Sequence, residues 1–349
     1  LRVFAFDPSL AAQLETLALN EASLAIPWEK LDPGPVGAYL DVVDLDPASG
    51  CAYAPVDLDD PALLATDGLA PSEADPRFHQ QMAYAVAMRT IGAFEQALGR
   101  PVLWAPHFER DAAGRLRERF VARLRIHPHA LREANAYYSP DRKALLFGYF
   151  RADGGTGAGH LPGGLVFTCL SHDVVAHETT HALLDGLHRR FREPTNPDVL
   201  AFHEAFSDIV ALFQHFGMPE ALAGEIARTR GDLGSENLLG ALARQFGQAL
   251  YGHGALRDFI GETVERDGEM VWVPRRPRAT DYDEARKAGE PHALGAVLVA
   301  AVFDAFLRIY RHRADPLVRL ATGGSGVLQP GALPAALVGA LAAEASKAA

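Results

Sequence analysis

The sequence predicts a protein of mixed α and β structure, and two observations support this prediction. From residue 1 to about residue 70, short apolar runs alternate with turn residues, as in Val3-Phe4-Ala5-Phe6 before Asp7-Pro8, which is typical of strands and turns. From about residue 165 onward, apolar residues instead recur at spacings of three and four, which is typical of helices. We therefore expect an α+β fold with a mixed, strand-rich N-terminal lobe and an all-helical C-terminal lobe.

Local patterns predict the individual elements in order. Residues 38–45 and 51–58 are apolar runs on either side of a turn that contains Pro47 and Gly50, which predicts a hairpin. Residues 76–98 have helical spacing and are followed by Gly99 and Pro101, which predicts a long helix that ends there. Residues 134–150 hold two strand-like pieces, and the glycine-rich residues 151–164 predict a loop. Further helices are predicted over 174–190, 198–216, 221–230, 238–250, 293–311 and 332–347.

These elements suggest three parts of the chain. Residues 1–70 form a strand-rich segment, which is either a cap or part of the N-terminal lobe. Residues 71–190 complete that lobe, and residues 191–349 form the helical C-terminal lobe, which we expect to be shortened or truncated. With 349 residues, 48% of them hydrophobic, the chain can form one large domain or two ordinary ones.

Composition excludes several classes of partner. The chain has 33 Lys and Arg against 44 Asp and Glu, a net charge of −11, which argues against nucleic acid or an anionic membrane as partner. Apolar stretches fall short of the roughly 20 residues that a membrane span needs, so we expect no membrane association. Cys51 and Cys169 form no CxxC pattern, so we expect neither a disulfide framework nor a thiolate metal site. The chain has no recognisable signal peptide, and its unpaired cysteines favour the cytoplasm over secretion, although the location stays unknown.

The clearest chemical motif is His177-Glu178-Thr179-Thr180-His181, an HExxH pattern inside an apolar stretch without Pro or Gly. On a helix, residues four apart share a face. Both imidazoles can therefore bind one metal ion, while Glu178 reaches a water molecule on that ion.

A second motif supplies further candidate groups. Glu204 lies 23 residues after His181, and Asp208 follows one helical turn later. Two His and one Glu, with a fourth position left for water, are the ligand set of catalytic zinc. Asp208 can accept a hydrogen bond from the outer nitrogen of a ligand His and so orient it.

With these residues the sequence resembles the thermolysin-like zinc metallopeptidases, the gluzincins. Residues 174–182 match the active-site helix of that family, and residues 204–209 match its third-ligand helix. Two further segments agree in order: Asn135-Ala136-Tyr137-Tyr138 resembles the strand that binds an extended substrate, and Pro291-His292-Ala293-Leu294-Gly295 resembles the segment whose His stabilises the oxyanion. The resemblance covers about residues 76–311 and is strongest over 171–213.

The resemblance implies a zincin-like fold and an endopeptidase that takes a peptide or protein as substrate. One Zn²⁺ per chain would be bound by His177, His181 and Glu204. Glu178 would act as the general base and His292 would donate to the oxyanion. Asn135 and Ala136 would bind substrate, and Val174 would line a pocket for its side chain.

Some expected features of the family are missing. A Tyr that assists His292 has no counterpart, and His188 is a possible substitute. The carboxylate that orients His292 must come from Glu290, Glu284 or Asp283. Asp173 matches a calcium ligand, but His215 stands where its acidic partner is expected, so a calcium cofactor is doubtful.

Two alternative functions remain open at this point. The chain could be a zinc-binding module of gluzincin fold that is catalytically inactive or latent. It could also hydrolyse a substrate other than a peptide with the same ion.

Overall fold

A computed structural model describes the chain except for residues 13–18, 153–162, 189, 236–238, 240–260, 267–268 and 276–277. The described residues contain both helices and strands, which confirms the mixed α and β class. They form two compact units, one made by residues up to Thr195 and the other by residues from Asn196 onward. Residues 1–70 therefore belong to the same unit as residues 71–190. The helix predicted over 238–250 and most of the loop predicted over 151–164 lie outside the described residues.

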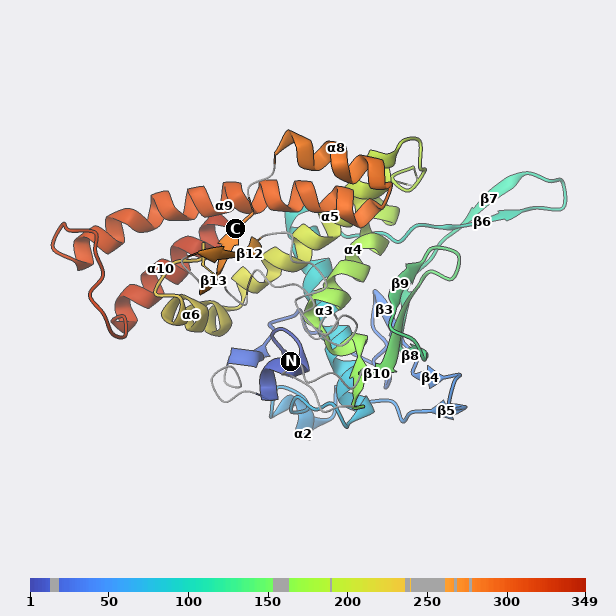
Figure 1. The fold of residues 1–349 in the computed structure, drawn as a ribbon. Helices are drawn as coiled ribbons and strands as arrows, with labels where there is room; N and C mark the ends of the chain where they lie inside the picture. The colour runs from blue at the N-terminus through green and yellow to red at the C-terminus, as the bar shows by residue number, and fades with distance from the viewer. Residues whose placement is uncertain are drawn as a thin grey trace. The chain divides into compact units, whose positions relative to one another are not determined.

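A five-stranded sheet is the main β structure of the first unit (Figure 1). Four of the strands are ordered β11-β10-β8-β3. The fifth, β9, pairs with residues 144–147 of β10, on the same edge that pairs with β11 at residues 149–151. β10 and β3 run parallel to β8, whereas β9 and β11 run antiparallel to β10. The bounds are β3 Leu40–Val42, β8 Leu124–Leu131, β9 Ala136–Ser139, β10 Ala144–Arg151 and β11 Leu165–Phe167.

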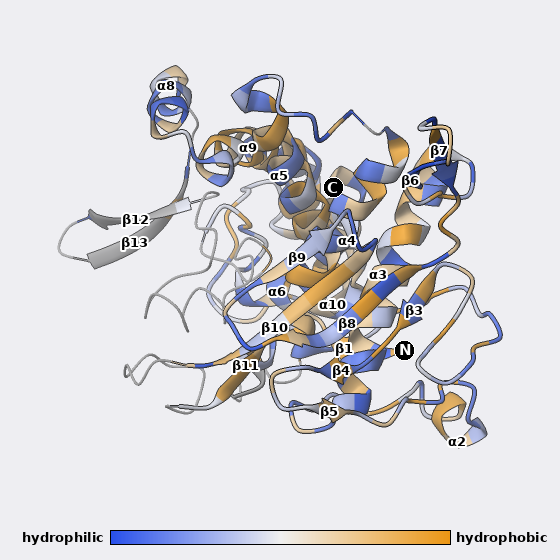
Figure 2. Cartoon of the chain, turned by 90° about the vertical axis from the view of Figure 1, so that its right-hand side faces the viewer, coloured by the Kyte–Doolittle hydropathy of each residue, from blue (hydrophilic) through white to orange (hydrophobic). Residues whose placement is uncertain are grey.

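The central strand β10 is apolar along most of its length, as its colour in Figure 2 shows. Residues 144–149 of β10 are all buried, because both faces of the strand are covered, and such strands read as continuous apolar runs. The two strand-like pieces predicted over residues 134–150 are β9 and β10, so that prediction is confirmed.

Two helices of the first unit matter most for function. α3 (Pro76–Leu98) begins at the N-cap Asp75 with Pro76 in its first turn, and it ends at Gly99 in the left-handed conformation, as the sequence predicts. α4 (His172–Leu187) begins at the N-cap Ser171. The two helices pack against each other, and α3 also contacts β1, β3 and β8.

The remaining elements of the first unit are short. They are β1 Arg2–Phe4, the 3-10 helix η1 Pro8–Ala12, β2 Glu21–Ser23, β4 Leu45–Asp46, β5 Cys51–Ala52, α2 Pro61–Leu64, β6 His107–Arg110, β7 Leu116–Arg119 and the 3-10 helix η2 Thr168–Leu170. β4 and β5 form the predicted hairpin in a shorter version. The residues expected to begin its first strand instead form β3, which pairs with β8.

The second unit is built around packed helices. α5 (Pro197–Gln214) packs along α9 (Pro291–Ala321), and α10 (Ala335–Ala348) packs against α9 and α6 (Pro219–Arg228). Between α5 and α9 lies a cluster of rings formed by Phe213, Phe216 and Phe306, and it continues to Tyr310. The other elements are η3 His215–Gly217 and α8 Ala279–Ala288, which packs on α9.

The prediction of an all-helical second half was wrong at residues 261–274. β12 (Gly261–Arg266) and β13 (Glu269–Pro274) form an antiparallel pair. Each run contains β-branched residues, such as Val264 and Val273, and the runs are separated in the sequence by Asp267-Gly268. An Asp-Gly pair between such runs is a strong hairpin signal, which the search for helical spacing overlooked.

α9 is long, with 31 residues, and strongly apolar. Among the described residues it is the one helix long and apolar enough to cross a membrane, with a mean hydropathy of 1.9 over its most apolar window. Half of that window is buried inside the protein, as in the core helix of a globular unit. Length and composition are therefore weak support for a membrane span.

The start of α3 gives a test of local stability. The Asp75 carboxylate accepts a hydrogen bond from the Arg77 backbone N–H at 3.0 Å, and its bonds to the Arg77 side chain hold the pKa of Asp75 below its usual value. A lowered carboxyl pKa stabilises the fold above the unfolded value of about 3.9 and loses that effect as the pH falls through the folded pKa. We expect Asp75→Ala to cost about 1 kcal/mol at pH 7 and clearly less at pH 2, measured by urea unfolding.

Asp75→Asn is the matched control, because its amide oxygen can still cap the helix but cannot ionise. The difference in the free energy of unfolding between Asp75→Asn and the wild type should become smaller as the pH is lowered. An Asp75→Ala cost that is the same at both pH values would contradict this explanation.

Candidate metal centre and its supporting residues

α4 carries the HExxH motif through the interior of the first unit. All residues from His172 to Asp185 are buried except His181, which is half-buried. Two threonines inside the motif donate to the backbone of the preceding turn: Thr179 to the Val175 carbonyl at 2.7 Å and Thr180 to the Ala176 carbonyl at 2.8 Å. These internal bonds satisfy buried hydroxyl groups, so the polar motif is compatible with a buried helix.

The two histidines of the motif point at the same place. Their Nε2 atoms are 2.9 Å apart, and the ring planes are nearly perpendicular, at 89°. Two nitrogens bound to one tetrahedral zinc ion at about 2.0–2.1 Å would lie roughly 3.3 Å apart, so a small rotation of the rings suffices for a shared ion. One carboxylate oxygen of Glu178 lies within 4.8 Å of a ring nitrogen of each histidine. His177, Glu178 and His181 are thus positioned to hold a metal ion.

Glu178 also joins the helix to the neighbouring strand. Its Oε2 atom accepts a hydrogen bond of 2.8 Å from the backbone N–H of Tyr138 in β9. The carboxylate is buried, and a backbone donor offsets part of the free energy that its desolvation costs. The bond fixes where the carboxylate of the motif sits relative to the strand.

A second contact anchors Tyr138 to the same helix. Its hydroxyl donates to Asp185 Oδ2 at 2.8 Å, and the Lys143 ammonium lies 3.3 Å from the same oxygen. Asp185 is seven residues after Glu178 and so lies two turns along the same helix face. Burial, and then the nearby Asp185 carboxylate, raise the pKa of Tyr138. The sequence analysis did not identify Asp185 or Lys143. The spacing of seven residues from Glu178, which places Asp185 on the same helix face, could have indicated Asp185.

Among the described strands, β9 pairs only with β10, so one of its edges is left without a neighbouring strand, and β9 begins with the predicted substrate-binding residue Ala136. Its pairing with β10 occupies one edge, and the N–H of Tyr138 that reaches Glu178 lies on the other. By strand alternation the backbone of Ala136 faces the same outer edge as that of Tyr138. The carbonyl of Asn135 faces inward and accepts from the Gly148 N–H at 2.9 Å. The backbone of Ala136, but not that of Asn135, is therefore oriented for strand addition.

Gly148 explains how the chain can pass so close to β10 at this point. A Cβ atom at Gly148 would lie 2.3 Å from the Glu133 carbonyl oxygen and 2.5 Å from that of Asn135. Any larger residue would push the start of β9 away. The Asn135 side chain is exposed.

Val174, the predicted pocket residue, lies in the first turn of α4 and is 9% exposed. It is one helical turn before His177.

His188, the possible substitute for the missing Tyr, lies at the C-terminal end of α4. It accepts a hydrogen bond from the Arg190 N–H. Its ring stacks on Phe191, so in this structure it stabilises the local turn.

In the second unit, the structure brings together two residues predicted from distant segments. Glu204 of α5 and His292 of α9 lie with Oε2 and Nε2 3.1 Å apart. The other ring nitrogen, Nδ1, lies 2.6 Å from Glu290 Oε1. Of the three carboxylates considered for orienting His292, Glu290 is therefore the one seen to contact it.

Glu290 holds the start of α9 as well as the His292 ring. As the N-cap it accepts from the backbone N–H groups of His292 at 3.0 Å and Ala293 at 2.6 Å. Burial raises the pKa of Glu290, but the hydrogen bonds from the His292 ring and from these two backbone groups outweigh it and lower the pKa overall.

Close packing of α5 and α9 makes the meeting of Glu204 and His292 possible. Gly295 lies one turn after His292, and a Cβ atom there would be 2.7 Å from the Ala201 carbonyl oxygen and 3.1 Å from the Ala205 nitrogen. Only a glycine permits this approach. Asp208, the predicted orienting carboxylate, is buried on α5 one turn after Glu204.

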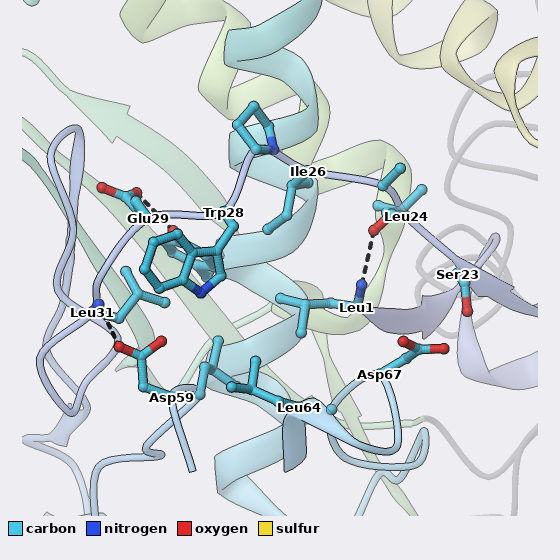
Figure 3. Close-up of a pocket in the computed structure, with 15 residues that line it drawn as sticks. Leu1, Ser23, Leu24, Ile26, Trp28, Glu29, Leu31, Asp59, Leu64 and Asp67 are labelled. Atoms are coloured by element: carbon cyan, nitrogen blue, oxygen red, sulfur yellow. Dashed lines mark hydrogen bonds between the residues drawn. The ribbon is translucent and has the colours of Figure 1, made fainter. Parts of the chain in front are cut away.

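The described residues include a second group that could hold a metal ion, formed by His79, His129 and Cys169. They also include a pocket of about 370 Å³ in the first unit, lined by apolar residues such as Leu24 and Leu64 and by Trp28 (Figure 3). This pocket contains none of the residues of the HExxH motif.

No protein-family model, no curated protein and no solved structure matches this chain. Its function is therefore argued from the residues and their geometry.

The double anchor of Tyr138 can be tested by removing one oxygen atom. Tyr138→Phe deletes the hydroxyl that donates to the buried Asp185 carboxylate. We expect a loss of about 1–3 kcal/mol in the free energy of unfolding, measured with urea. The neighbouring Tyr137, which is exposed, supplies the control: Tyr137→Phe should change stability by less than about 0.5 kcal/mol. Equal effects of the two substitutions would show that the Asp185 contact contributes nothing.

Proposed function

We propose that this protein is a zinc-dependent metallopeptidase, most simply an endopeptidase. The observation that carries the proposal is the convergence of the His177 and His181 Nε2 atoms, 2.9 Å apart, next to the carboxylate of Glu178. Convergent imidazoles with an adjacent carboxylate are the donor set and the base of metal-assisted hydrolysis. The assignment of Glu204 as the third ligand rests on the sequence pattern alone.

The donor set fits zinc on chemical grounds. Two neutral imidazoles and one carboxylate suit Zn²⁺ better than Ca²⁺ or Mg²⁺, which prefer oxygen ligands. A bound zinc ion would supply Lewis acidity and a water molecule that loses its proton near neutral pH.

Glu178 would hold the proton taken from the attacking water and pass it to the leaving amine. Its Oε2 atom accepts a hydrogen bond from the Tyr138 N–H. The same bond fixes the carboxylate in one orientation, and a fixed base loses less entropy on reaching the transition state.

The outer edge of β9 would hold an extended substrate. Backbone N–H and C=O groups at an uncovered strand edge bind peptides by strand addition, whatever their side chains. Ala136 provides such groups on the edge next to Glu178. This arrangement favours cleavage within a chain and supports endopeptidase over terminal cleavage.

His292 would donate a hydrogen bond to the developing oxyanion. Glu290 fixes its Nδ1 atom, so Nε2, which lies 3.1 Å from Glu204 Oε2 in this structure, is the nitrogen that would donate once a metal ion binds Glu204. Donors to an oxyanion typically contribute a factor of about 10²–10³ to the rate.

The first experiment compares the wild type with Glu178→Gln. We expect both to bind one zinc ion at the HExxH motif and the variant to hydrolyse a fluorogenic protein substrate about 10²–10⁴-fold more slowly, because an amide cannot take the proton. Glu118→Gln, at an exposed residue of β7, is the control and should retain full activity. Zinc without hydrolysis in the wild type would contradict the peptidase proposal and favour a latent zinc module. Cleavage of esters but not peptides would point to a different hydrolase.

The assignment of Glu204 can be tested by metal affinity. Glu204→Gln should weaken zinc binding at least about tenfold, measured by competition with a chelator, because a charged ligand is replaced by a neutral one. Glu220→Gln, at an exposed position in the first turn of α6, should bind zinc as the wild type does. Unchanged affinity in Glu204→Gln would remove Glu204 from the ligand set.

A further inference from the structure

A second cluster of metal-ligating groups lies in the core of the first unit. His79 comes from α3, His129 from β8 and Cys169 from the 3-10 helix η2. These three elements contact one another. Each of the three residues is at most 1% exposed, so the cluster is closed to solvent.

The donor atoms of the cluster converge. His79 Nδ1 and His129 Nε2 are 2.8 Å apart, and the Cys169 sulfur lies within 4.8 Å of one ring nitrogen of each histidine. Two nitrogens and one sulfur from three separate elements therefore face one point.

The outer nitrogen of each ring has its own acceptor. His79 Nε2 lies 3.0 Å from the Glu73 carbonyl oxygen, and His129 Nδ1 lies 2.7 Å from Asp44 Oδ1. Ligand histidines typically donate their outer N–H to a carbonyl or a carboxylate in this way. The other oxygen of Asp44 accepts from the Gln80 amide at 2.8 Å, which holds the carboxylate in place.

This pattern requires a proton or a metal ion between the two inner nitrogens. A carbonyl oxygen can only accept, so His79 Nε2 carries a hydrogen and a neutral His79 has its lone pair at Nδ1. An ionised Asp44 likewise places a hydrogen on His129 Nδ1, which leaves the lone pair of a neutral His129 at Nε2. Two lone pairs 2.8 Å apart repel each other unless a proton or a metal ion lies between them.

We propose that His79, His129 and Cys169 supply three ligands of a buried site for a zinc-class ion, separate from the HExxH residues. Nitrogen and thiolate ligands select zinc or a related transition metal over calcium and magnesium. The expectation from the sequence that no thiolate metal site exists rested on the missing CxxC spacing, which a site assembled from three distant elements does not need.

The test separates this site from the HExxH motif. The full chain is produced as the double variant His177→Ala/His181→Ala, in cells grown with cobalt in place of zinc. We expect one cobalt ion per chain and a near-ultraviolet thiolate-to-cobalt absorption band. Adding Cys169→Ala to this background should abolish the band and reduce bound metal at least about tenfold.

The other cysteine is the matched control. Cys51 is exposed in β5, so Cys51→Ala in the same background should keep both the band and the metal. Absence of metal in the double variant, or a band unaffected by Cys169→Ala, would overturn the proposal. Circular dichroism shows whether the Cys169→Ala chain is folded. If it is not, His79→Gln in the same background is measured instead, and an unchanged band there would also overturn the proposal. These outcomes do not depend on whether Glu178 catalyses hydrolysis.

Discussion

Burying the helix α4 is the constraint on which the candidate metal centre depends. The helix carries imidazole, carboxylate and hydroxyl groups into the interior, and each such group costs free energy unless it finds a partner. The threonine hydroxyls are satisfied by the helix itself. Glu178 accepts a hydrogen bond from the Tyr138 backbone N–H, and Asp185 accepts one from the Tyr138 hydroxyl and another from Lys143. One residue of a neighbouring strand thus satisfies two buried carboxylates, so the position of the strand and the chemistry of the motif are set together.

In the second unit, two side chains from different helices lie within hydrogen-bonding distance of each other. Glu204 and His292 can meet because the backbones of α5 and α9 approach closely at Gly295. Glycine in the middle of a helix costs roughly 0.5–1 kcal/mol relative to alanine. Here that cost is offset by packing between α5 and α9, including the rings of Phe213 and Phe306.

Local signals predicted much of the secondary structure. Asp75, Pro76 and Gly99 mark the ends of α3, and the apolar stretch around the HExxH motif marks α4. The hairpin of β12 and β13 also had a local signal, the Asp-Gly pair, which was overlooked in favour of helical spacing.

Contacts between distant segments could not be predicted in this way. Tyr138 is 40 residues from Glu178 and 47 from Asp185, and no periodicity connects them. The cluster of His79, His129 and Cys169 likewise joins three separate elements. Sequence spacing finds ligands that share one helix, but it does not find ligands that only the tertiary fold brings together.

The bond between Glu178 and Tyr138 has a consequence for any extended chain that adds to the outer edge of β9. The Tyr138 N–H on that edge is already committed to the carboxylate, so the incoming chain cannot form the full ladder of hydrogen bonds there. Since side chains alternate along a strand, sliding such a chain by one residue would exchange its two faces. If a chain binds there, this edge would set its register through backbone hydrogen bonds rather than through its side chains.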